Sequence, residues 1–430
     1  MRRTIKELKN FFLLWSTQSL SQLGSTMTNF ALTLWLYEKT GSALQTALLS
    51  ICSYTPYVLM SIFAGALSDR WDKKKTMLVC DTLAALCTVS VLILLKTDTL
   101  APVHMYILNA VNGLMNTVQQ PASEVAMSLI TPKEHYQRTS GLKSFSNSLV
   151  NILHPIIATA LFAAFGMEAV ICIDLSTFAA AFLTLFFFIK IPKLEQTGEK
   201  KRSILSDAKE GLVYLQKNRL ILLLILFLAG INLVASACDA VLPAFVLSKT
   251  NGNETILGFV SAASGIACLV GSLIVTALPA PKNRVRVIIV TMFISMCTEN
   301  LLLSVSGLPA LWCLWQVVGW LPVPIMSANL DVIFRSTIPP EMQGRVYSCR
   351  NTLQFFTIPI GLFLGGLLVD EVCEPFMETA GGIWTALFGS GKGSGAALVL
   401  FILGVTGTAV CLIFGRLLRN YKFEGSTQKH

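Results

Sequence analysis

The sequence has few charged side chains and very few histidines. Only 13% of the 430 residues are charged, 53% are hydrophobic, and the chain has four histidines. So low a charge content excludes an ordinary soluble globular protein. The solvent for most of the chain must therefore be lipid.

Reactive motifs are also missing. The eleven cysteines are an odd number, contain no C-x-x-C pair and lie almost wholly inside apolar stretches, so we interpret them as packing residues. The sequence contains no Ser/His/Asp order, no metal-ligand cluster and no phosphate-binding loop. We therefore expect no enzyme, no cofactor, no metal and no transport driven by ATP.

Long apolar stretches recur along the whole chain. A bilayer core about 30 Å thick requires roughly 20 apolar residues per helix. Twelve stretches meet this requirement, and they predict an all-α membrane protein. The predicted spans are 11–37, 42–68, 76–96, 102–130, 140–164, 169–190, 218–247, 255–279, 287–306, 308–336, 346–370 and 395–419.

The basic residues are distributed very unevenly between the predicted loops. Of the 33 lysines and arginines, 29 lie on one side of the predicted spans, and only Lys39, Lys96, Lys249 and Lys392 lie on the other. The positive-inside rule places the N-terminus and the C-terminus in the cytoplasm. The net charge of +9 then faces anionic lipid, so we expect the bilayer and not nucleic acid as the partner.

Two halves of the chain repeat one design. An offset of 207 residues takes Glu124 to Asp331 and Arg138 to Arg345. We therefore predict two pseudo-symmetric six-helix bundles, residues 1–190 and 218–430, joined by a linker, 191–217. Apolar residues at helical spacing over 204–215 predict an amphipathic helix in that linker.

Polar side chains recur at intervals of three or four residues in several predicted spans, so each set forms one helix face. Together these faces predict a hydrated substrate cavity, with hydrogen bonding between helices as the alternative. The predicted cavity residues are Gln18, Gln22, Asn29, Tyr54, Tyr57, Asn109, Asn112, Asn116, Asn147, Asn151, His154 and Asn232.

Four acids lie well inside predicted spans, where a charge costs about 2.5 to 3.5 kcal/mol. We expect Asp239, with Glu299, to couple transport to protons, because Asp239 shares the polar stripe of its span. A static hydrogen-bonded carboxylate is the alternative. Asp174 and Asp81 are interpreted as structural acids.

Acids and arginines meet at one end of both halves. We interpret Glu124 with Arg138, and Asp331 with Arg345, as ion pairs that close the inner side of the cavity and break when it opens. Purely structural pairs are the alternative. The stretch 371–394 is expected to form an external mobile loop or an interfacial cap.

The loop between the second and third predicted spans carries a recognisable pattern. Gly65, Asp69, Arg70, Lys73 and Lys74 lie in a basic inner loop that resembles the signature loop of the major facilitator superfamily. The segments 37–42 and 344–347 look like those of its bacterial macrolide-efflux and drug:proton antiporter branch. The resemblance implies a major facilitator fold with a site near the bilayer midplane.

The resemblance also implies a function: proton-coupled efflux of small amphipathic compounds by alternating access, in the bacterial inner membrane. This sequence departs from the branch at two places. Asn109 stands where many such antiporters carry an arginine, and His154-Pro155 lacks the neighbouring glycines of the antiporter motif. Export of lipid-like or siderophore substrates is the alternative, a channel or membrane-embedded enzyme is more remote, and we expect a monomer.

Overall fold

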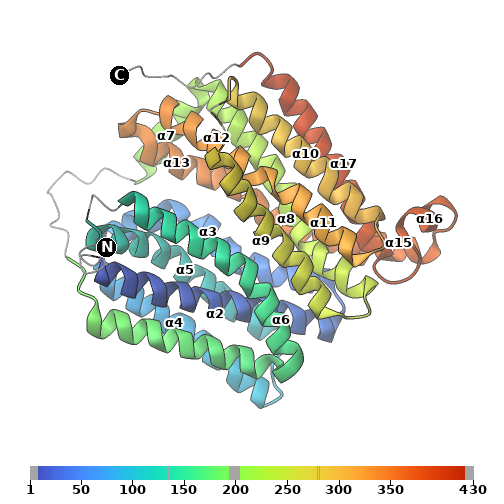
Figure 1. Ribbon diagram of the computed structural model, residues 1–430, viewed down its shortest axis with the longest axis horizontal. Helices are drawn as coiled ribbons and strands as arrows, with labels where there is room; N and C mark the ends of the chain where they lie inside the picture. Colours follow the sequence, from blue (N-terminus) through green and yellow to red (C-terminus); the bar gives the residue numbers. More distant parts are fainter. Residues whose placement is uncertain (1–7, 133–135, 193–203, 278, 280, 422–430) are drawn as a thin grey trace. The chain divides into compact units, whose positions relative to one another are not determined.

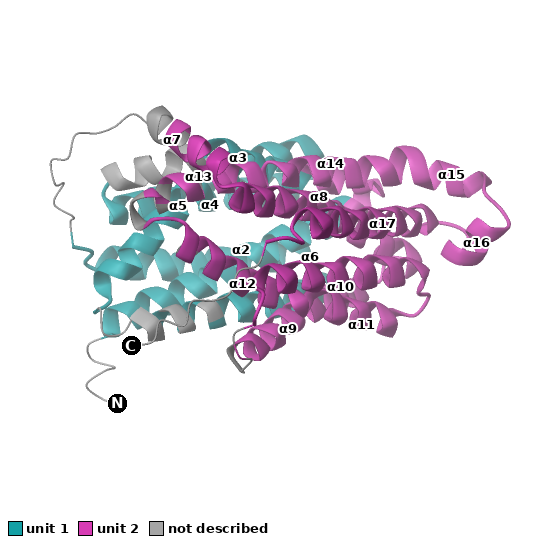
Figure 2. Cartoon of the chain, turned by 90° about the horizontal axis from the view of Figure 1, so that it is seen from above, with its two compact units in different colours: residues 1–36, 49–204 teal, residues 37–48, 205–430 magenta. Residues whose placement is uncertain are grey.

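The computed structural model describes residues 8–132, 136–192, 204–277, 279 and 281–421. Within these ranges the side chains of 61–70, 136–138, 140, 141, 144, 204–208, 276, 277, 335, 340, 341, 343, 344 and 348 lie outside the description. This part of the chain is helical, with no strand (Figure 1). The contacts divide it into two compact units, shown in Figure 2. Unit 1 comprises residues 1–36 and 49–204, and unit 2 comprises residues 37–48 and 205–430.

The helices occupy the predicted spans. In chain order their bounds are α2 Lys9–Thr40, α3 Ala43–Arg70, α4 Lys73–Lys96, α5 Pro102–Ile130, α6 Tyr136–Leu183 with η2 Thr184–Phe188, α7 Ile204–Lys217, α8 Arg219–Lys249, α9 Glu254–Ala277, α10 Arg284–Val305, α11 Pro309–Trp320, α12 Pro322–Thr337, α13 Pro340–Phe355, α14 Thr357–Leu367 with η3 Leu368–Cys373, α15 Glu374–Thr379, α16 Ile383–Phe388 and α17 Ser394–Leu417.

Eight helical segments of the described chain are long and apolar enough to cross a membrane. One of them, Phe145–Phe188, has 44 residues and would extend about 66 Å if it were straight, roughly twice a bilayer core. Gly166 interrupts it with a non-helical φ of 75°, so two predicted spans meet there. Helices α2 and α5 fall outside the set of eight, and their faces carry many of the amide side chains predicted to line a cavity.

Unit 1 is held together by an apolar core around α2. Met27, Ala31 and Leu36 pack with Met105 and Val170 there, and all five are buried. Helices α2 and α6 approach closely at Gly24, where an added Cβ would lie 3.0 Å from the Cα of Asp174. This contact fixes the Asp174 side chain against α2.

Unit 2 is built on close contacts between helices. Helix α14 packs on α8, and α17 packs on α10. At Gly365 an added Cβ would lie 2.5 Å from the carbonyl oxygen of Ala237, so only glycine allows the backbones of α14 and α8 to come this close. Small residues at helix interfaces are typical of membrane bundles, where dispersion forces replace the hydrophobic effect.

The stretch 371–394, for which a mobile loop or an interfacial cap was expected, contains the helices α15 and α16. The carboxylate of Glu374 accepts hydrogen bonds from the backbone N–H groups of Gly393 (2.6 Å) and Gly395 (3.2 Å), at the start of α17. The Lys249 ammonium donates to the carbonyl oxygen of Phe388 at 2.8 Å. These bonds tie the stretch to the ends of α8 and α17.

Candidate functional site

A cavity of about 660 Å³ lies inside unit 1. Cavities of about 300 to 1,000 Å³ are typical of sites for drug-sized molecules. Helices α2 to α6 all contribute to its wall. Seven of the predicted cavity residues line it: Gln18, Gln22, Asn29, Tyr54, Asn112, Asn116 and Asn147.

Two acids that we had interpreted as structural also line this cavity. Asp81 of α4 and Asp174 of α6 are only 8% and 4% exposed. The Gln119 amide donates to Oδ1 of Asp81, while Oδ2 of Asp81 and Nε2 of Gln18 are buried and make no hydrogen bond of normal geometry with a described residue. Sequence reasoning gave these acids too little weight because each stands in a largely apolar helix. The one available signal was the small or polar face formed by Asp81, Ala84, Ala85 and Thr88.

The third acid of this cavity has a basic partner. Glu124 accepts a hydrogen bond from the Lys143 ammonium at 2.9 Å, and both side chains line the cavity. Among the described residues of the cavity wall Lys143 is the one basic side chain, and Asp81 and Asp174 exceed it in number. The side chain of Arg138, the predicted partner of Glu124, lies outside the described residues.

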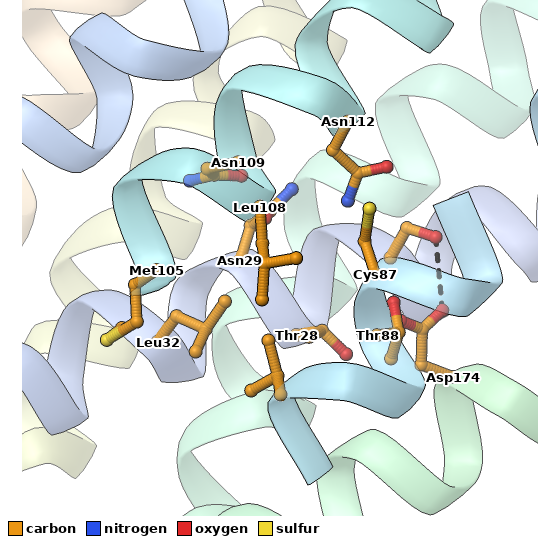
Figure 3. A pocket seen from close by; sticks show the side chains of 12 residues that line it. Thr28, Asn29, Leu32, Cys87, Thr88, Met105, Leu108, Asn109, Asn112 and Asp174 are labelled. Carbon is orange, nitrogen blue, oxygen red and sulfur yellow. Dashed lines mark hydrogen bonds between the residues drawn. The ribbon is translucent and has the colours of Figure 1, made fainter. Parts of the chain in front are cut away.

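A much smaller cavity, of about 20 Å³, adjoins the large one and shares part of its wall. Asp174, Thr28, Asn29 and Asn112 surround it, as Figure 3 shows. Oδ1 of Asp174 accepts a hydrogen bond from the Ser25 hydroxyl at 3.0 Å. The space is large enough for one water molecule or a small ion.

The other predicted cavity residues take different positions. Asn109 lines only the small cavity, and its amide donates to the carbonyl oxygen of Leu49 at 3.2 Å. Nδ1 of His154 lies 3.0 Å from the carbonyl oxygen of Val150, and its ring packs edge-on against Phe30. The remaining three line neither cavity: Tyr57, Asn151 and, in unit 2, Asn232, whose amide donates to the carbonyl oxygen of Gln354 at 3.1 Å.

The predicted proton-coupling acids lie near each other in unit 2. Glu299 of α10 is only 9% exposed and accepts a hydrogen bond from Nε1 of Trp320 at 2.9 Å. Gly319 leaves room for this carboxylate, since an added Cβ would lie 2.5 Å from its Oε2. The side chain of Asp239 on α8 is exposed, and the negative charges of the two acids repel each other.

The predicted gate residues of unit 2 contact the linker helix α7. Nη1 of Arg345 lies 2.7 Å from the Glu210 carboxylate of α7. Asp331, the predicted partner of Arg345, has an exposed side chain and interacts electrostatically with Arg350. Arg350 in turn stacks over the ring of Phe334 at 4.8 Å.

The signature loop is only partly described. The side chains of Asp69 and Arg70 lie outside the described residues, and so do the surroundings of Gly65. Lys73 is 6% exposed. The Lys74 ammonium donates to the carbonyl oxygens of Ile189 at 2.7 Å and Phe186 at 3.0 Å, at the end of η2. A cation there satisfies carbonyl groups that a helix end leaves without partners.

Sequence reasoning missed the function of Asp370 in η3. Its carboxylate accepts hydrogen bonds from the backbone N–H groups of Ala43 (3.0 Å) and Leu44 (2.8 Å) and from the Ser42 hydroxyl. It therefore caps the N-terminus of α3. No spacing in the sequence indicates this contact, because Asp370 and Ser42 are more than three hundred residues apart.

The combination of apolar helices, a polar cavity and buried acids within it is that of a membrane transporter. The Major Facilitator Superfamily profile matches residues 14–361, which is most of the chain. The chain belongs to this superfamily and has its all-helical membrane fold.

Two relatives are efflux proteins. The chain is 27% identical over 369 residues to macrolide efflux protein A of Streptococcus pyogenes, covering 84% of this chain and 90% of the relative. It is 24% identical over 352 residues to the multidrug efflux pump Tap of Mycolicibacterium fortuitum, covering 78% and 83%.

Solved structures share the fold at low sequence identity. The nucleoside transporter NupG superposes with a TM-score of 0.70 at 13% identity, covering 96% of this chain and 100% of that chain. A bacterial homologue of the iron transporter ferroportin gives a TM-score of 0.67 at 15% identity, covering 95% and 98%. At these identities the similarity concerns the fold alone.

Proposed function

We propose that the protein is a secondary transporter that exports small amphipathic compounds from a bacterial cell by alternating access, coupled to the inward flow of protons. The observation that carries the proposal is the cavity of about 660 Å³ in unit 1, whose wall combines amides, carboxylates and the exposed ring of Tyr54. Such a wall suits a molecule with an apolar body and a few polar groups. The efflux relatives support the direction of transport.

Asp239 and Glu299 are the proposed proton site. The charges of the two carboxylates repel each other, and Glu299 is 9% exposed. One bound proton relieves the repulsion and lowers the cost of holding the buried Glu299 carboxylate within the bundle. Trp320 donates to Glu299 and fixes the orientation of its carboxylate.

The test is transport by purified protein in proteoliposomes. A macrolide antibiotic added to the wild type should drive proton movement, and the variants Asp239→Asn and Glu299→Gln should abolish that movement while they still bind the macrolide. Glu371→Gln is the matched control, because Glu371 is an exposed acid of the same unit. Unchanged coupling in both variants would remove Asp239 and Glu299 from the mechanism.

A further inference from the structure

The small cavity of unit 1 has a mixed wall, in which Leu32, Val91, Met105 and Leu108 form an apolar part and polar side chains gather around one acid. The side chains of Ser25, Thr28, Asn29, Thr88 and Asn112 surround it together with Asp174. These residues offer hydroxyl, amide and carboxylate oxygens, which are the atoms that hard cations prefer. None of the described lysines, arginines and histidines lines the cavity.

Thr28 provides the observation that points to a ligand. Its side chain is 5% exposed and lies beside the Asp174 carboxylate. Its Oγ1 nevertheless makes no hydrogen bond of normal geometry with any residue that the structure describes. A buried hydroxyl without a partner is costly, so a ligand placed between Thr28 and Asp174 would satisfy both side chains.

The charge at this cavity needs a counter-ion. Asp174 is 4% exposed, and no ion pair of this acid is found among the described residues. A buried carboxylate without a partner is strongly disfavoured unless a cation or a proton neutralises it. Since only one carboxylate lines the cavity, a single positive charge balances it.

We propose that Asp174, Thr28 and the neighbouring amide and hydroxyl oxygens of unit 1 bind a sodium ion. A bound proton would neutralise Asp174 but would add no partner for the Thr28 hydroxyl, whereas a small cation contacts both side chains at once. The cavity volume of about 20 Å³ admits one small ion.

The sodium site opens toward the proposed substrate cavity. Ser25, Asn29, Thr88, Asn112 and Asp174 line both cavities. An ion held here offsets part of the negative charge that a substrate meets in the large cavity. The site lies in unit 1, separate from the acids proposed to bind the proton in unit 2, and it does not depend on the direction or the substrate of transport.

The experiment measures sodium binding to the full chain in lipid nanodiscs, with no substrate and no gradient present. We expect wild-type protein to bind radioactive sodium and to unfold at a higher temperature in sodium chloride than in choline chloride of equal ionic strength. The variants Asp174→Asn and Thr28→Val should weaken sodium binding by about tenfold or more, the effect expected when a group that holds a cation is lost.

Two further variants keep the test decisive. Thr28→Ser keeps the hydroxyl and should retain sodium binding. Thr82→Val is the matched control, because the Thr82 hydroxyl is exposed and bonds the Leu78 carbonyl oxygen of its own helix. The proposal is overturned if sodium and choline act alike at every pH, or if sodium binding survives in Asp174→Asn. Neither outcome bears on the proton measurements with Asp239→Asn, so the two proposals fail separately.

Discussion

Among individual side chains, Asp370 makes an unusual contact, because a residue near the end of one helix caps another helix far away in the sequence. The first N–H groups of α3 have no partner within their own helix. Asp370 supplies two acceptor oxygens, at 3.0 Å from the amide nitrogen of Ala43 and 2.8 Å from that of Leu44. Its negative charge also lies beside the positive end of the helix dipole, and this interaction is stabilising. The contact therefore holds residues 42–44 against η3.

Replacing Asp370 by alanine should loosen the start of α3. Loss of such a cap costs about 0.5–2 kcal/mol, which corresponds to roughly tenfold faster opening at the middle of that range. Hydrogen exchange measured by mass spectrometry should show this increase in peptides that cover residues 42–48. Glu371→Ala, at an exposed neighbouring acid, should leave the exchange unchanged. Equal exchange in Asp370→Ala and the wild type would show that the cap contributes nothing to the stability of this segment.

The amide side chains of α2 and α5 could be placed on the cavity wall from the sequence because their spacing follows the period of a helix. Gln18, Gln22 and Asn29 on α2, and Asn112 and Asn116 on α5, form such stripes and line the cavity. A single acid in an apolar helix has no such periodicity. The position of Asp174 depends on the close approach of α2 at Gly24, which is a tertiary contact.

At the level of helices, the linker stretch 204–215 lies in α7, which docks on α12 and α13 of unit 2. The Tyr214 hydroxyl donates to the carbonyl oxygen of Thr337 at 3.0 Å, and burial raises the pKa of this phenol above its usual value.

The contact of α7 with α13 is closest at a glycine. At Gly211 an added Cβ would lie 2.8 Å from the carbonyl oxygen of Arg345. The ion pair of Arg345 with Glu210 is partly exposed, so it contributes only about 0.2–1 kcal/mol. We therefore expect close packing at Gly211 to contribute more to docking than the ion pair.

The variant Gly211→Ala tests close packing by the direction in which it changes the stability of α7. In an undocked helix this change stabilises by about 0.8–1 kcal/mol, because alanine favours helix more than glycine does. In the docked helix the added methyl group collides with α13, which costs about 1–3 kcal/mol. We therefore expect faster hydrogen exchange in residues 209–217 of Gly211→Ala and a smaller effect in Glu210→Gln. Lys209→Ala, at an exposed site of the same helix, is the control. Slower exchange in Gly211→Ala would show that α7 does not pack closely on α13.

Helix breaks were predictable only where proline or glycine causes them locally. Pro322 and Pro324 bend the predicted tenth span, and α11 ends at Trp320 before α12 begins at Pro322. Gly166 breaks α6 with its positive φ, as the length limit of a bilayer span requires. The π-helical segment η3 begins shortly after Gly366 and contains neither glycine nor proline. Its form depends on packing against α14, α15 and α17, which the sequence pattern does not specify.

Across the full chain, the asymmetry of charge gives a prediction for orientation. Because 29 of the 33 basic residues lie on one side of the predicted spans, insertion with that side in the cytoplasm is strongly favoured. A phosphatase that is active only outside the cytoplasm should be active when fused after residue 391, next to Lys392, and inactive when fused after residue 421. A fluorescent protein that matures only in the cytoplasm should give the opposite pattern at the same two sites. Each reporter is fused at both positions, so a reversed topology requires a gain of signal at one site as well as a loss at the other. Poor expression of one fusion causes only a loss and is therefore not mistaken for a reversed topology. Phosphatase activity at residue 421 together with fluorescence at residue 391 would mean that the chain inserts the other way, and the proposed direction of proton-coupled export would then have to be reversed.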